Sequence, residues 1–120
     1  MAVNRRRGEV AAIIDGEERR LCLTLGALAE LEDAFAADNL GELANRFRGG
    51  KLSAKDLTRI IGAGLRGGGA EVSDAEVGAM GINGGAAGAA AIAVELLAAA
   101  FGSDREAAGT GIANPSLAGG

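Results

Sequence analysis

Residues 8–35 change their hydrophobic period in the middle of the run, and this change limits the folds that the chain can adopt. Two alternating segments flank Asp15-Gly16, and an Asp-Gly pair supplies the two positive-φ positions of a tight hairpin turn. From Leu25 onward the apolar residues recur with a helical period, and the Thr24 hydroxyl can cap the first turn. The sequence therefore predicts a β-hairpin that runs directly into an amphipathic helix. The alternating residues are Val10, Ala12, Ile14, Arg19, Leu21 and Leu23, and the helical set is Leu25, Leu28, Leu31 and Phe35.

Four further apolar stripes follow, each bounded by capping residues or glycines. Ser53 with Asp56 and Ser73 with Glu76 have the spacing of a capping box, in which each side chain bonds the other residue's backbone amide. The stripes are Leu40, Leu43, Ala44 and Phe47; Leu57, Ile60, Ile61 and Leu65; Val77 and Met80; and Ala89, Ile92, Ala93, Leu96 and Ala100 in an alanine-rich helix that begins near Ala86.

These patterns predict an α+β fold that is mostly α, with an N-terminal β-hairpin, four to five short helices and a C-terminal tail. We expect residues 1–102 to form a single hairpin-plus-helices domain, because one domain is typical of a chain of 120 residues. Residues 103–120 are small, polar and glycine-rich, and we expect them to form a disordered tail.

Glycines inside the third predicted helix have two interpretations. Gly62, Gly64 and Gly67 match the G-x-G-x-x-G spacing of dinucleotide-binding loops, but such a loop must follow a strand and open a helix. These glycines stand at the end of a helix instead, so the helix-stop interpretation is favoured and no cofactor is expected. Gly62 and Gly64 are expected to let another backbone come close.

The composition argues against catalysis and metal binding. The chain has no histidine, which removes the commonest general base and the commonest metal ligand. Its carboxylates are explained by helix caps and solvated faces, so we expect no catalytic residues, no metal site and no small-molecule substrate. Cys22 is the only cysteine, and we expect a buried, inert thiol in a protein of the reducing cytoplasm.

Charge and hydropathy narrow the range of partners. The net charge of −4 argues against nucleic acid as the main partner, and the basic run Arg5–Arg7 is typical of a solvated arm. Because Gly8 and Glu9 follow that run, we expect that it does not begin an export signal. Residues 84–101 resemble a membrane span only superficially, because Glu95 interrupts them and alanine and glycine dominate. A packed or partner-binding helix is expected there.

The alanine-rich helix is the candidate partner-binding surface. Ile92, Leu96 and Phe101 are the candidate contact residues, because several helix faces of this aromatic-poor chain can accept another helix at short range. Burial of the same residues in the protein's own core is the competing interpretation. Self-association is a further use of such a surface.

Three segments of the chain resemble a known family. The run from Arg6 to Glu32, with its hairpin and Leu21-Cys22-Leu23-Thr24-Leu25-Gly26, is similar to small gene transfer agent tail proteins of alphaproteobacteria. Residues 57–66 and 72–77 resemble the same family, and the likeness covers about residues 3–101. The segment from Met80 to Gly85 departs from the charged linker that the family pattern has before its last helix.

The resemblance implies a role in phage-like tails. This family has been grouped with phage tail assembly chaperones and has also been labelled tail tube protein. The resemblance therefore implies that the chain is a chaperone that binds the tape measure protein and tail tube protein during tail morphogenesis. The alternative is a structural, tube-associated component of the particle. We favour the chaperone at this point, because a tube subunit normally needs a large sheet to close a ring and the sequence offers one hairpin.

Overall fold

The hairpin and the helices form in the order that the sequence predicts. The computed structural model describes residues 8–48 and 51–101. The strands are β1 (Glu9–Ile14) and β2 (Glu17–Cys22), and the helices are α1 (Leu25–Ala34), α2 (Leu40–Arg48), α3 (Ala54–Gly67), α4 (Asp74–Gly78) and α5 (Gly85–Phe101). The expected α+β, mostly α fold is confirmed. The expected tail at 103–120 lies outside the described residues.

The β1–β2 hairpin has the register that its turn dictates. Asp15 and Gly16 have φ values of 55° and 77°, as the two central positions of the tight turn require. The strands pair antiparallel from Ile14 opposite Glu17 to Glu9 opposite Cys22. Val10 and Leu21 are directly opposite each other and are both buried, so one face of the hairpin forms part of the core.

A short segment from a distant part of the sequence extends the hairpin. Ile82 forms an antiparallel bridge with Ile14, and the Asn83 amide donates to the Ile13 carbonyl at 3.1 Å. The Asp15 amide donates to the Gly81 carbonyl and the Gly81 amide donates to Asp15 Oδ1, both at 2.7 Å. The turn of the hairpin is therefore fixed to the segment that precedes α5.

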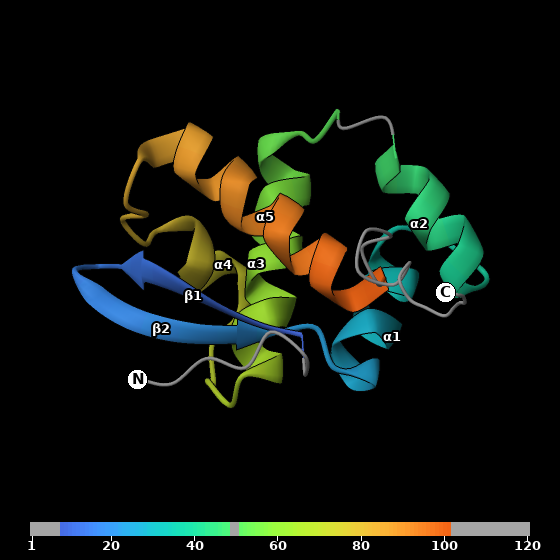
Figure 1. Ribbon diagram of the computed structural model, residues 1–120, viewed down its shortest axis with the longest axis horizontal. Helices are drawn as coiled ribbons and strands as arrows, with labels where there is room; N and C mark the ends of the chain where they lie inside the picture. Colours follow the sequence, from blue (N-terminus) through green and yellow to red (C-terminus); the bar gives the residue numbers. More distant parts are fainter. Residues whose placement is uncertain (1–7, 49–50, 102–120) are drawn as a thin grey trace, which may run out of the picture.

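Helix α3 is the centre of the molecule. It contacts β2, α1, α5 and α4, and Figure 1 shows both α5 and the hairpin crossing it. Ile60, Ile61 and Leu65 are buried on it. Helix α2 extends away from this centre, where it contacts α1, and its Leu43 and Phe47 are buried.

The predicted caps are confirmed at three helices. The Thr24 hydroxyl accepts from the Ala27 amide, and both capping boxes, Ser53 with Asp56 and Ser73 with Glu76, are complete. Asp56 is buried, and its carboxylate accepts from the Ser53 amide at 3.0 Å. The local signals therefore place the beginnings of α1, α3 and α4 correctly.

Three packing expectations are corrected by the structure. Leu25 begins α1 and is 78% exposed, although Ala27 and Leu28 in the same turn are buried. Leu40, at the start of α2, is 40% exposed. The close approach of a neighbouring backbone occurs at Gly67 and Gly68, where an added Cβ would collide with the Cys22 and Arg20 carbonyls.

The glycines that were expected to meet a backbone meet side chains instead. A Cβ on Gly64 would lie 2.9 Å from Leu96 Cδ1 and 3.3 Å from Leu21 Cβ, and one on Gly62 would collide with the Asp74 carboxylate. Because Gly64 has no side chain, Leu21 of β2 and Leu96 of α5 can both pack against α3 at this position. The helix-stop interpretation of these glycines agrees with their position in α3, which ends at Gly67.

Candidate partner-binding surface

The structure separates the three candidate residues of α5. Leu96 is 0% exposed and packs at Gly64, so it contributes to the core of this chain rather than to its surface. Ile92 and Phe101 are half-buried. Nine positions separate them, which places them about 180° apart around a helix. The three residues therefore do not form one contiguous surface, because Leu96 faces inward between the other two.

The outward face of α5 is apolar. Ala89, Ala93 and Leu96 are the buried residues of this helix and define its inward side. The opposite side presents small and branched apolar residues, with Val94 57% exposed at its middle. Glu95 is the only charged residue among the 17 residues of the helix. The exposed outward residues are Ala87, Ala91, Val94, Glu95 and Ala98.

This face differs from the outward faces of the other long helices. The exposed residues of α1 include Glu30 and Asp33, and those of α2 include Glu42, Arg46 and Arg48. Exposed single apolar residues are normal, but a run of apolar positions at spacings of four, three and four is the pattern of a helix that contacts another helix. The outward face of α5 is thus suited to receive a helix of a partner.

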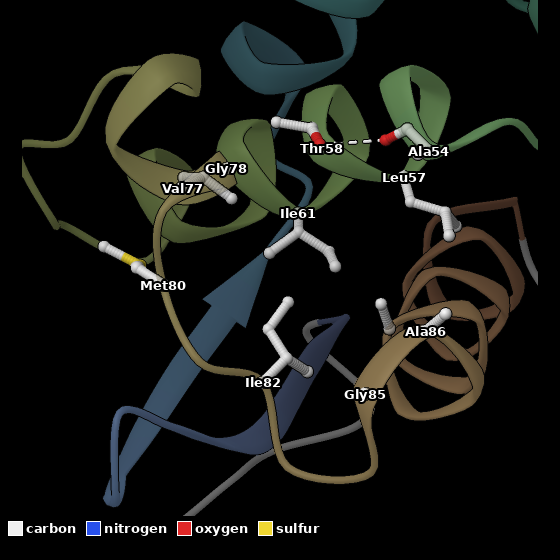
Figure 2. A pocket seen from close by; sticks show the side chains of 11 residues that line it. Ala54, Leu57, Thr58, Ile61, Val77, Gly78, Met80, Ile82, Gly85 and Ala86 are labelled. Atoms are coloured by element: carbon white, nitrogen blue, oxygen red, sulfur yellow. Dashed lines mark hydrogen bonds between the residues drawn. The ribbon is translucent and has the colours of Figure 1, made fainter.

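An apolar pocket lies beside the beginning of α5. It encloses about 210 Å³ between α3, α4 and the segment that precedes α5. Figure 2 shows Ile61 and Ile82 pointing toward one another across it, with Met80 at one side and Leu57 at the other. The residues that line it are Ala54, Leu57, Thr58, Ile61, Val77, Gly78, Met80, Ile82, Gly85, Ala86 and Ala89.

The pocket can hold an apolar group but offers little chemistry. Thr58 supplies the only side-chain hydroxyl in its lining, and this hydroxyl donates to the Ala54 carbonyl at 2.8 Å. No carboxylate, amine or thiol of the described residues lines it. A pocket of this kind suits one bulky aliphatic or aromatic side chain of a partner.

Arg66 and its two carboxylate partners link three helices. Arg66 donates to Glu30 Oε1 at 2.7 Å, lies 3.1 Å from Asp74 and donates to the Val72 carbonyl, so it joins α1, α3 and α4. The hydrogen bond to Glu30 is the main cause that raises the pKa of Arg66, and burial opposes it. The described residues contain no group of three potential metal ligands.

Cys22 is half-buried rather than fully buried. Burial raises the pKa of its thiol above the ordinary value of 9.0, the nearby Glu9 carboxylate adds to the rise, and Arg20 opposes it. The neutral thiol is therefore favoured at neutral pH, which agrees with the expectation of an inert group.

Several residues of the candidate surface were not identified from the sequence. Val94 interrupts the alanines of α5, and its spacing from Ala87, Ala91 and Ala98 could have indicated a second apolar face. The pocket had no sequence signal of its own, because Leu57, Met80 and Ile82 come from three separate segments. In the part of the chain that the structure describes, no helix has the length and apolarity that a membrane span needs.

The chain was compared with protein families, curated proteins and solved structures. A family model described as phage tail tube protein, GTA-gp10, matches residues 7–103 of the chain. The matched range includes the hairpin and all five helices. No curated protein and no solved structure matches the chain.

Proposed function

The chain belongs to the phage tail tube protein family described as GTA-gp10, and on that premise we propose that it is a structural, tube-associated component of a gene transfer agent tail. The observation that carries the proposal is the extent of the match, which covers the whole described fold rather than one motif. The preference for a chaperone at the level of the sequence is therefore revised in favour of its alternative.

Contacts between proteins are sufficient for this role. The outward face of α5 offers apolar positions for a partner helix, and the pocket beside Ala86 offers a place for one apolar anchor side chain. The proposal assigns no role to catalysis, a cofactor or nucleic acid. Other tail proteins, a second copy of this chain or both are the proposed partners.

The small sheet supports a second candidate, the tail assembly chaperone that binds the tape measure protein and tail tube protein. In the described residues the sheet has two strands and one bridge at Ile14, and both edges of the hairpin contact the chain itself. The Asn83 amide donates to Ile13 at the edge of β1, while Gly67 and Gly68 lie against the carbonyls of β2. A ring that closes through a continuous sheet would need these contacts to be replaced.

The copy number of the protein in finished particles separates the two candidates. We expect quantitative mass spectrometry of purified particles to find this chain at a fixed ratio to the other tail proteins. Particles with normal tails but without the chain would contradict the structural role and favour the chaperone, which would act in the cytoplasm before the tail is complete. A pull-down with the tape measure protein, compared between wild type and Val94→Asp, tests the chaperone directly.

A further inference from the structure

The apolar pocket and the outward face of α5 meet at the first turn of this helix. Ala86 lines the pocket and is exposed, and Ala87, the first residue of the outward face, follows it directly. The apolar positions of that face continue to Ala98, close to the end of the helix. Because α5 has 17 residues, its two ends are about 24 Å apart, and Figure 1 shows them on opposite sides of α3. The described residues thus leave an apolar path uncovered from the end of α5 to the pocket.

The lining of the pocket is suited to one bulky aliphatic side chain. Figure 2 shows Ile61 and Ile82 pointing toward one another across it. The Thr58 hydroxyl donates to the Ala54 carbonyl at 2.8 Å, so its hydrogen is already used within α3. A polar or charged occupant would lose its contacts with water and find few hydrogen bonds in return, and such burial is costly. The pocket therefore favours a side chain such as that of leucine or isoleucine.

The chain itself contains suitable side chains beyond the end of α5. Residues 103–120 include two bulky aliphatic residues, Ile112 and Leu117, among small ones. Charged side chains stand only at positions 104–106 of this segment, so the stretch 107–120 can lie on an apolar face without burying a charged side chain. The match to the family model ends at residue 103, so both aliphatic residues lie beyond the pattern that the family shares.

The number of residues after Phe101 favours Leu117 as the one that reaches the pocket. Leu117 follows Phe101 by 16 positions, and Ile112 follows it by 11. A connection of small residues without secondary structure spans on average about 22 Å at 16 residues and about 18 Å at 11. Binding within one chain is strongest when the average span matches the distance to be covered, here about 24 Å. The longer connection gives the better match.

The segment outside the described residues at the other end of the chain, 1–7, is a poorer occupant. A Cβ added to Gly8 would lie 3.8 Å from the Ala99 carbonyl oxygen, so this segment joins the described fold near the end of α5. Ala99 and Ala86 are about 20 Å apart along the helix. Val3 precedes Gly8 by five positions and reaches at most about 18 Å from it. The basic run Arg5–Arg7 would also have to cross the apolar face, where its charges would lose water.

We propose that residues 107–117 return along the outward face of α5 and that Leu117 occupies the pocket while no partner is bound. A side chain attached to the same chain acts at an effective concentration of about 1 mM, so a modest affinity is sufficient. A tail protein that buries a larger area on α5 displaces the segment, which thus covers the apolar surface until assembly. This last role rests on the proposed function, whereas the docking of Leu117 within one copy does not.

Methyl NMR spectroscopy of the full chain tests the docking. We expect Leu117→Asp to shift the methyl signals of Ile61 and Ile82, because the pocket loses its occupant. Asn114→Asp is the matched control: it adds the same charge to the segment but retains the anchor, so both signals should stay in place. The signals of Leu43, which is buried on α2, should be unchanged in both variants and report that the fold is intact.

A nitroxide label distinguishes docking within one copy from docking between copies. The label is attached at Ser116→Cys in a chain that also carries Cys22→Ala, so that it has one attachment site. It should broaden the methyl signals of the pocket more than those of Leu43, and dilution with unlabelled chain should not change the broadening. Adding Leu117→Asp should abolish this preference for the pocket.

Three results would overturn the proposal. The first is a set of pocket signals that does not respond to Leu117→Asp. The second is an equal response to Asn114→Asp, which would mean that the added charge causes the shift. The third is broadening that occurs only between a nitroxide-labelled copy and an isotope-labelled copy, which would assign the pocket to a second copy of the chain. The copy number in particles is measured independently, so either proposal can fail without the other.

Discussion

The two sides of α5 differ in how completely the chain packs against them. On the inward side, Leu96 and Leu21 both pack against Gly64 of α3. Helix α5, helix α3 and strand β2 therefore meet at this glycine. On the outward side Val94 is exposed among alanines, and an apolar pocket remains open near Ala86. The inward side is completed by the chain itself, whereas the outward side has the composition of a surface that another protein completes.

The sharpest way to test this difference is to truncate one residue on each side of α5. We expect Leu96→Ala to lower the free energy of unfolding by about 3 kcal/mol, because it leaves a cavity at the contact with Gly64 and Leu21. Val94→Ala should change it by less than about 0.5 kcal/mol. Urea unfolding followed by circular dichroism measures both, and equal losses would mean that the outward face is also part of the core.

A second test adds a methyl group at the contact between α3 and the hairpin. Gly67→Ala should lower the free energy of unfolding by about 2 kcal/mol, because the new Cβ would collide with the Cys22 carbonyl. Gly26→Ala in α1 is the control: its Cβ would meet Thr24 Oγ1 at an ordinary 3.8 Å, and alanine favours a helix. The control should be neutral or stabilising by up to about 1 kcal/mol, and a similar loss in both variants would refute the close contact at Gly67.

Filling the pocket sharpens the comparison on the outward side. Ala86→Leu places a larger apolar side chain at the lining of the pocket, and we expect a gain in unfolding free energy of up to about 1 kcal/mol. The same variant should enter tail particles less efficiently, if a partner side chain normally occupies the pocket. Normal incorporation of Ala86→Leu, measured by mass spectrometry of particles, would exclude the pocket as a partner site.

The smallest expected effect concerns pH and Cys22. A thiol whose pKa is raised by folding stabilises the fold fully below its unfolded pKa, and this contribution is lost as the pH rises through the higher folded value. The wild type should therefore lose slightly more stability than Cys22→Ala as the pH is raised above about 9. Thermal unfolding of both proteins between pH 7 and about pH 10 measures this, and parallel curves would show that the Cys22 environment is unimportant.

Much of the local structure could be predicted because its causes lie close together in the sequence. The Asp15-Gly16 turn fixes the hairpin register, and Thr24, Ser53 and Ser73 cap helices by bonding amides three residues ahead. The end of α3 at Gly67 follows from the run of glycines there. In each case the decisive partners are no more than a few positions apart.

The inward and outward sides of α5 could not be predicted from the sequence, because they depend on contacts between distant segments. The sequence identified α5 as the helix to consider and left open whether Leu96 contacts a partner or the core; the structure buries Leu96 and exposes Val94. An alanine-rich helix with apolar residues on every side has a weak amphipathic signal, so its inward face cannot be read from its own pattern. The packing of Leu96 against Gly64 of α3 determines which side of α5 faces the core.

The sequence by itself determined the hairpin, the order of the helices and their caps, since alternation, helical period and capping are local properties of the chain. Only the tertiary structure decided that Ile82 extends the hairpin at Ile14, that Gly67 accepts the backbone of β2 and that Val94 faces outward. The physical reason is that burial is set by which surfaces meet. Ile14 and Ile82 are far apart in the sequence, so the contact between them cannot be predicted from the residues around either one.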